Sequence, residues 1–234
     1  MENIPVLFHI GPLAINATVV TTWALMAALA LFCLLMTARL QVHDPGKKQV
    51  VLESVAAAVE NAVADVMPDN PRLLVPFIGT LWAFIVCANL IGLVPGLHSP
   101  TGDLSLTASL ALLVFFSVHW YGIRADGLRT YLRHYMKPTP LMFPFHIISE
   151  LSRTVALAVR LFGNIASLEM AALLVLIVAG FLVPVPILLL HVVEALVQAY
   201  IFGMLALVYI AGGIQFRQQT KVQPDIEETT EAKP

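Results

Sequence analysis

Two charged side chains lie nine residues apart in one long apolar run of this 234-residue chain, Arg160 and Glu169. Both are far from any end of that run where a charged group could reach water. On insertion scales, an arginine at the middle of a bilayer costs roughly 2.5–3.5 kcal/mol. A residue kept at that cost is a functional candidate by default. Because a guanidinium does not lose its proton, Arg160 would act as a fixed cation.

The helix expected around Arg160 has one small and polar stripe. At 100° per residue, the residues within about 60° of the arginine are Gly163, Asn164, Ser167 and Ala171. Small residues allow another surface to approach a helix closely in the membrane. Glu169 is expected on the opposite side of the helix, at about 180°. The arginine and the glutamate should therefore face different neighbours.

A second polar group lies in the last apolar run. His191, Glu194 and Gln198 fall within about 60° of one another on a helix. If this run packs antiparallel to the run that carries Arg160, Gln198 comes level with Arg160. Glu169, His191 and Glu194 then gather towards the outer side. Titratable groups on one side and a fixed cation at the middle indicate a proton entry path that ends at an electrostatic gate.

The composition predicts an all-α integral membrane protein. Hydrophobic residues make up 59% of the chain and charged residues only 12%, and the mean hydropathy is +0.84. The apolar runs are long and continuous. This excludes a β-barrel, whose strands would be short segments of alternating hydrophobicity. We expect a single membrane domain over residues 1–234, with five membrane-crossing helices, one amphipathic surface helix at 49–66 and a disordered tail at 217–234. The five spans are expected at about 17–38, 73–93, 104–123, 145–182 and 187–214.

The last two spans are too long to cross a bilayer upright. A helix over 145–182 would be about 60 Å long, twice the thickness of the hydrocarbon layer, so it must be tilted or broken. Pro184 and Pro186 should turn the chain into an antiparallel hairpin. All lysines and arginines other than Arg160 fall on the side reached after the first span. This asymmetry predicts the N-terminus outside and the C-terminus in the cytoplasm.

Several motifs together resemble subunit a of the F-type ATP synthase membrane sector, as found in bacteria. The resemblance lies in Arg160-Leu161-Phe162-Gly163-Asn164 followed by Glu169, in His191 followed by Gln198-Ala199-Tyr200-Ile201-Phe202, and in Asn89-Leu90-Ile91-Gly92-Leu93-Val94-Pro95. It extends over most of the chain, including the first span and the surface helix. The family fold it implies agrees with the five predicted spans.

The resemblance implies a role for each polar residue. Arg160 would face the carboxylate of a rotating ring of c subunits, and Glu169 and His191 would line the half-channel from the outside. Asn164 and Gln198 resemble the polar residues that flank the arginine. Glu194 matches no residue for which the family is best known, and it would add an acid to the outer path. Whether protons or sodium ions pass is left open, because the ring decides it.

The resemblance also implies partners and location. The partners would be the c ring, the b-type peripheral stalk and the remaining subunits, with membrane lipid around the chain and no nucleic acid. The location would be the bacterial inner membrane. No cofactor, metal or catalytic site is expected in this chain. It lacks a G-x-x-x-x-G-K-[ST] loop, so ATP chemistry would occur in other subunits.

The main alternative is a stand-alone ion transporter or channel. Against it, the sequence has no inverted repeat and no matched pair of broken helices. Structural alternatives remain for single residues. Arg160 could form an ion pair with Glu169 or Glu194 that only fastens helices. Glu169 and His191 could satisfy each other, and Asn164 and Gln198 could simply join two helices.

Overall fold

A computed structural model describes the backbone of residues 6–10, 13–38, 46–68, 70–94, 99–127, 142–179 and 185–231, with side chains described for most positions between Ala17 and Ile214. The helices in these ranges are α1 (Ala17–Thr37), α2 (Lys47–Val66), α3 (Val75–Leu90), α4 (Leu104–Asp126), α6 (Met142–Ala179) and α7 (Val185–Glu231). Short 3₁₀ turns flank α3 and precede α4: η1 (Pro71–Leu73), η2 (Ile91–Leu93) and η3 (Pro100–Gly102). The predicted all-α membrane fold is confirmed.

Five helices in the described chain are long and apolar enough to cross a membrane. They cover Ala17–Thr37, Val75–Leu93, Leu104–Arg124, Pro144–Val178 and Val185–Ile214. Each agrees with a predicted span to within a few residues, and α2 occupies the position of the predicted surface helix. Local signals explain several ends. Pro76 lies in the first turn of α3, Asp103 accepts a hydrogen bond from the N–H of Ser105 at 2.9 Å to start α4, and Gly127, at φ +80°, ends α4.

The N-terminal hairpin was not predicted. Strands β1 (Val6–Ile10) and β2 (Leu13–Asn16) pair antiparallel directly before α1. Their residues are mostly apolar but too few to show a clear alternating pattern, so periodicity alone does not predict strands here.

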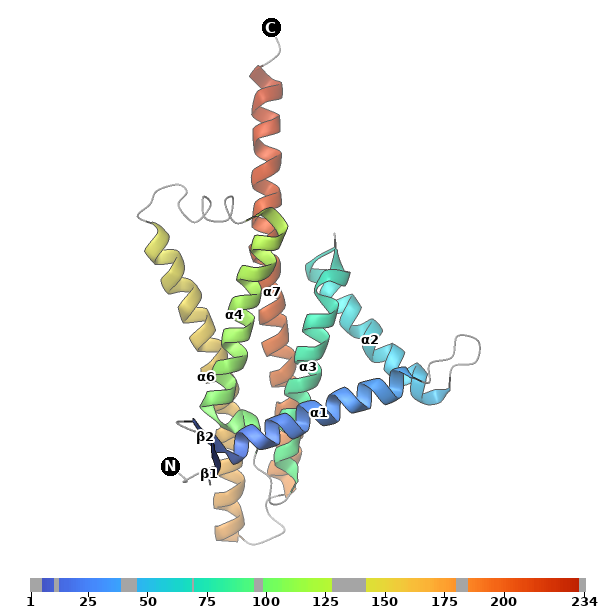
Figure 1. The fold of residues 1–234 in the computed structure, drawn as a ribbon, viewed down its shortest axis with the longest axis vertical. Helices are drawn as coiled ribbons and strands as arrows, with labels where there is room; N and C mark the ends of the chain where they lie inside the picture. The colour runs from blue at the N-terminus through green and yellow to red at the C-terminus, as the bar shows by residue number, and fades with distance from the viewer. Residues whose placement is uncertain are drawn as a thin grey trace.

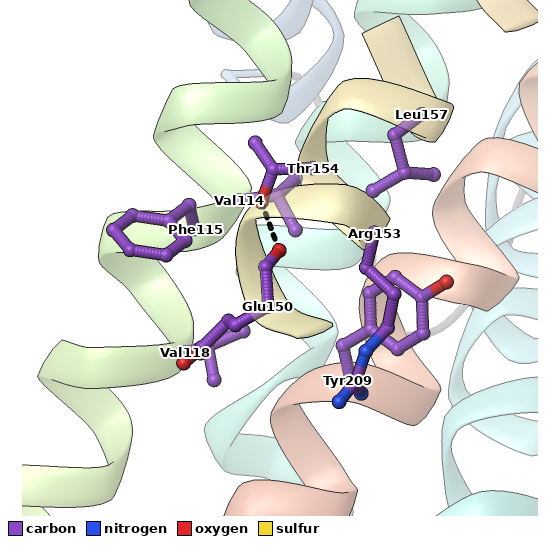
Figure 2. A pocket seen from close by; sticks show the side chains of 8 residues that line it. All are labelled: Val114, Phe115, Val118, Glu150, Arg153, Thr154, Leu157 and Tyr209. Carbon is purple, nitrogen blue, oxygen red and sulfur yellow. Dashed lines mark hydrogen bonds between the residues drawn. The ribbon is translucent and has the colours of Figure 1, made fainter. Parts of the chain in front are cut away.

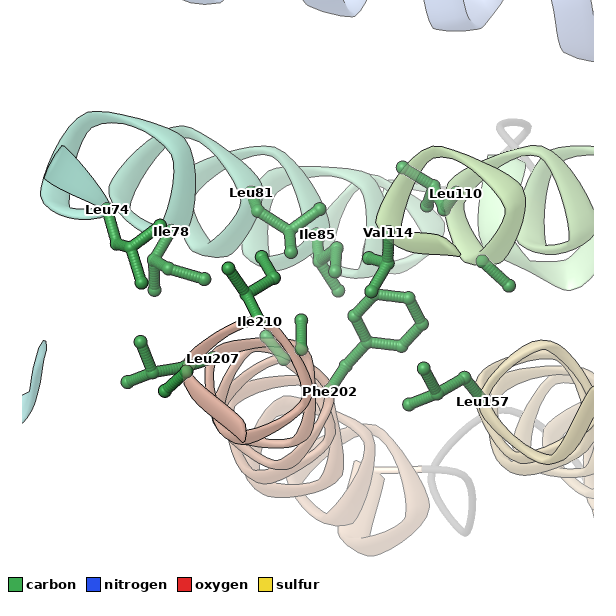
Figure 3. Packing of buried hydrophobic residues seen from close by; sticks show 14 of the residues in the cluster. Leu74, Ile78, Leu81, Ile85, Leu110, Val114, Leu157, Phe202, Leu207 and Ile210 are labelled. Carbon is green, nitrogen blue, oxygen red and sulfur yellow. The ribbon is translucent and has the colours of Figure 1, made fainter. Parts of the chain in front are cut away.

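Helices α3, α4, α6 and α7 form the bundle that positions the polar residues (Figure 1). In its core, the Phe202 ring of α7 reaches the space between Val114 of α4 and Leu157 of α6 (Figure 3). Apolar side chains gain little by leaving lipid, so close packing must hold such a bundle together. Small buried residues of α7 serve this purpose: Ala195, Ala199, Ala206 and Ala211.

Helix α1 lies largely outside this core, and α2 packs against its edge. Helix α1 runs obliquely away from the bundle and α2 returns towards α3 (Figure 1). Only Thr22 of α1 is buried, whereas α2 contributes Val63 to the core. Contact between α2 and α3 is close at Gly79, where an added Cβ would lie 3.5 Å from Val59. Helix α2 therefore packs against the bundle along one face.

The C-terminal tail differs from the expectation of disorder from residue 217. The helical backbone of α7 continues to Glu231. Strong helix formers such as Gln218, Gln219 and Lys221 allow a helix to continue beyond its packed part.

Candidate functional site

Arg160 lies on an open face of α6. Its side chain is exposed, as are other residues that recur at helical spacing along the same helix: Ala156, Ser167, Met170 and Leu174. Between described residues the structure gives one ion pair, and Arg160 takes no part in it. The alternative in which Arg160 is fastened to Glu169 or Glu194 is therefore not found among the described residues. The guanidinium is left facing outward from its own chain.

One hydrogen bond fixes the level of Arg160 against α7. The amide Nδ2 of Asn164 donates to Oε1 of Gln198 at 2.7 Å. Asn164 is one turn from Arg160, so Gln198 does lie close to the level of the arginine, as the hairpin predicts. Gln198 is 1% exposed, and its Nε2 has no hydrogen-bond partner in the described structure. The bond joins the two long helices immediately beside the open face.

Glu169 faces the other way, towards the turn before α4. Its Oε1 accepts a hydrogen bond from the backbone N–H of Ser99 at 2.9 Å. Two glycines border the same carboxylate. A Cβ added to Gly92 would lie 2.8 Å from Oε1, and one added to Gly102 would lie 3.2 Å from Oε2. The predicted separation of Glu169 from Arg160 on opposite sides of α6 agrees with these contacts.

A buried network continues from Ser99 towards α7. The Ser99 and Thr101 hydroxyl oxygens are 2.6 Å apart, and Thr101 donates to Oδ1 of Asn89 at 2.6 Å. Asn89, which is fully buried, donates from Nδ2 to the carbonyl of Ala195 at 3.2 Å. Polar groups from α3, η3, α6 and α7 are thus linked in one chain of contacts.

His191 joins this network through the backbone. Its ring is 3% exposed, and Nε2 lies 3.2 Å from the carbonyl oxygen of Asn89. A carbonyl only accepts, so Nε2 carries the proton in this contact. The alternative of a direct Glu169–His191 pair is replaced by separate partners, Ser99 for one and Asn89 for the other. Glu194 is half-buried and contributes to neither contact.

The opposite end of the bundle holds a second group of polar side chains. A small cavity of about 30 Å³ lies between α4, α6 and α7, bordered by Glu150, Arg153, Thr154 and Tyr209 among others (Figure 2). Oε2 of Glu150 lies 3.7 Å from Nε2 of His119, and the Arg153 guanidinium lies 5.1 Å from the centre of the Tyr209 ring. This end therefore combines an acid and a cation around a small space, with an imidazole 3.7 Å from the acid.

Sequence reasoning missed Ser99 and Thr101. Both belong to the turn between α3 and α4, and both are buried at 4% and 0% exposure. A sequence signal existed, because two hydroxyl residues flank Pro100 directly before a long apolar run. Hydroxyl residues are common in turns, however, so the signal could not separate a buried network from an ordinary connection.

Comparison with known proteins identifies the family. Residues 19–211 match the family model described as ATP synthase A chain. The chain is 58% identical over 229 residues to "ATP synthase subunit a 2" of Pelobacter propionicus, covering 98% of this chain and 100% of that protein. It is also 58% identical to "ATP synthase subunit a 1" of Hahella chejuensis, over 97% of each chain. A more distant relative, "ATP synthase subunit a" of Nitrosospira multiformis, is 41% identical over 97% of this chain and 91% of its own.

These matches span nearly the whole chain, and the five apolar helices agree with them. The sequence-based resemblance is confirmed. The chain belongs to the ATP synthase subunit a family, whose members are membrane-sector components of that complex and are not themselves catalytic.

Proposed function

We propose that this chain is the stator at which a rotating c ring exchanges ions, with Arg160 as the central cation between two half-channels. The observation that carries the proposal is the open position of Arg160. An exposed guanidinium on a membrane-spanning helix, without an ion-pair partner among the described residues, is costly until another chain supplies an anion. A carboxylate on the ring would be that anion.

The chemistry follows from the change of surroundings as the ring turns. A ring carboxylate facing lipid is held neutral, because a bare charge there is too costly. Beside Arg160 the opposite charge favours the ionised form, so the carboxylate releases its proton or sodium ion. The permanently charged arginine also blocks direct leakage between the two paths. Each charge that crosses the membrane supplies about 2.3 kcal/mol per 100 mV for rotation.

The outer half-channel is assigned to the buried network. Glu169 and His191 are its titratable groups, and Ser99, Thr101 and Asn89 form the contacts between them. These contacts would hold the two titratable groups in place beside the path, since Glu169 bonds a backbone N–H and His191 a backbone carbonyl, neither of which passes a proton on. Asn164 and Gln198 would hold the level of the arginine at the inner limit of this path. Glu194, half-buried on the same helix, would add an acid beside the route.

The inner half-channel is assigned to the cavity beside Glu150. It lies on the side of Arg160 away from Glu169, between three helices that also form the bundle core. Arg153, about 10 Å from Arg160 along α6 by helical rise, borders the same space. The Glu150 carboxylate beside a small cavity at this end would accept the released proton.

The remaining parts of the proposal concern surroundings and partners. The chain would lie in the bacterial inner membrane with its N-terminus outside and its C-terminus in the cytoplasm, as the one-sided placement of lysine and arginine supports. Its partners would be the c ring, the b-type peripheral stalk and the catalytic subunits. Family membership disfavours the alternative of a stand-alone transporter.

Membrane vesicles containing the assembled complex test this proposal. We expect Arg160→Ala to abolish ATP synthesis driven by a proton gradient while vesicles stripped of the catalytic head still leak protons, since the block between the paths is removed. Glu169→Gln should lower both activities, because it removes a group of the outer path. Gradient-driven ATP synthesis in the Arg160→Ala complex would refute the proposed function.

A further inference from the structure

Two glycines border the Glu169 carboxylate, and because they have no side chains there is room for it between them. A Cβ on Gly92 would lie 2.8 Å from Oε1 of Glu169 and 3.0 Å from the Cβ of Ser99. A Cβ on Gly102 would lie 3.2 Å from Oε2 of the same carboxylate. The two glycines belong to different turns, η2 and η3, and so approach the carboxylate from separate parts of the chain.

Backbone conformation does not explain these glycines. In the part of the chain that the structure describes, the only glycine in the left-handed region is Gly127. Gly92 and Gly102 therefore adopt backbone angles that alanine also adopts. What glycine provides at both positions is room for an acid side chain.

The room matters because of one hydrogen bond. Oε1 of Glu169 accepts from the backbone N–H of Ser99 at 2.9 Å, and an added Cβ on Gly92 would lie 3.4 Å from that same nitrogen. A methyl group at position 92 would thus press on the accepting oxygen and on the Cβ of Ser99, the residue that donates. At position 102 it would press on the carboxylate alone, from a greater distance.

Comparison with other glycines shows that a close approach to a carboxylate is specific to Gly92 and Gly102 among the described glycines. An added Cβ meets nothing within 4 Å at Gly163 and Gly212, and it meets Val59 at an ordinary 3.5 Å at Gly79. Among the described glycines, only Gly92 and Gly102 are placed against a carboxylate.

We infer that Gly92 and Gly102 are positioning residues for Glu169. By leaving its carboxylate room on the Ser99 N–H, they hold it at the end of the Ser99–Thr101–Asn89 contacts. This inference rests on the proposed role of Glu169 in the outer half-channel. It adds that the route depends on the absence of side chains at two turns.

Passive proton conduction tests the inference, measured in vesicles stripped of the catalytic head and normalised to the amount of assembled complex. We expect Gly92→Ala to lower conduction about tenfold, since it disturbs the hydrogen bond that holds the Glu169 side chain. Gly102→Ala should lower it about threefold, because its contact is longer and a flexible side chain can yield. Gly212→Ala and Gly79→Ala are the matched controls and should stay within about twofold of the parent.

A compensating variant separates positioning from general damage to the fold. Glu169→Asp shortens the acid by one methylene and returns the space that a methyl at position 92 would take. The double variant Gly92→Ala/Glu169→Asp should conduct better than Gly92→Ala alone, a non-additivity typical of residues in contact. Effects that simply multiply would overturn the inference, as would Gly92→Ala and Gly102→Ala behaving like the Gly212→Ala control.

If the proposed role of Glu169 itself is wrong, the conduction measurements give a different result. Normal conduction by Glu169→Gln would remove Glu169 from the ion path and with it the reason to position the carboxylate. Loss of conduction by Glu169→Gln, with both glycine variants unaffected, would refute only the inference about the glycines.

Discussion

The open flank of α6 and the buried network behind it are built in opposite ways. On the flank, Arg160 is exposed and has no ion-pair partner among the described residues. Behind the helix, Glu169, Ser99, Thr101 and Asn89 satisfy one another through contacts of 2.6–2.9 Å. In the proposed function another chain completes the flank, whereas the contacts of the network lie within this chain. Substitutions should therefore act through partner recognition in the first region and through internal order in the second.

The largest effect is expected at the open flank, from Arg160→Lys. Lysine keeps a positive charge but loses the planar, permanently protonated fork that a carboxylate can engage at two points. We expect ATP-driven proton pumping by inverted vesicles to fall about 100-fold or more, with complex assembly unchanged.

Arg124→Lys provides the control for this variant. Arg124 is also exposed, but it lies in the last turn of α4, outside the two half-channels proposed above. Equal losses from the two lysine variants would mean that the open flank has no special role.

Within the buried network, Asn89→Ala should have the next largest effect. It removes the acceptor of the Thr101 hydroxyl and the donor to the Ala195 carbonyl, so the Thr101 hydroxyl keeps only its contact with Ser99. We expect the purified protein to lose about 2–4 kcal/mol of stability, measured by unfolding in detergent.

Ser109→Ala is the matched polar-to-apolar control, because the exposed Ser109 hydroxyl bonds only to a carbonyl of its own helix, that of Ser105. If Asn89→Ala lowered the stability no more than Ser109→Ala, the buried network would not stabilise the helix bundle.

The bond between the two regions can be measured by a double-mutant cycle. Asn164→Ala and Gln198→Ala each remove one side of the 2.7 Å contact that joins α6 and α7. We expect a coupling energy of about 0.5–1.5 kcal/mol in unfolding experiments. Strictly additive losses would show that the contact does not link the helices.

The smallest effect is expected from Tyr209→Leu, which removes the ring below Arg153. The cation–π contact at 5.1 Å should be worth about 0.5–1 kcal/mol of stability at an exposed site. Tyr209→Phe keeps the aromatic face and should be nearly neutral in the same assay. A matching loss from Tyr209→Phe would assign the effect to the hydroxyl group instead.

The sequence predicted the parts of the molecule that depend on helical periodicity. Long apolar runs located the five spans, and the 100° step placed Arg160 and Glu169 on different sides of α6. The antiparallel hairpin placed Gln198 near the level of Arg160, which the bond to Asn164 confirms. These predictions succeed because length and period are properties of one segment at a time.

The buried network could not be predicted, because its contacts join segments that lie far apart in the sequence. The turn that holds Ser99 and Thr101 meets Glu169 about seventy residues later in the chain, and Asn89 meets Ala195 after more than one hundred. Such contacts are set by how the bundle packs, so the sequence left a direct Glu169–His191 contact open as an alternative, whereas the structure gives the two residues separate partners. The glycines that border Glu169 carried no sequence signal, because glycine is expected in turns for other reasons.

Photo-crosslinking on the open flank tests the central claim most directly. In a background with Cys33 and Cys87 replaced by serine, a benzophenone attached at Ser167→Cys would report what passes this exposed side of α6. A second label at Phe116→Cys, on an exposed part of α4, reports another apolar surface. The account predicts a crosslink to the c ring from position 167 and none from position 116. Crosslinks from position 167 to lipid or to the peripheral stalk alone would contradict it.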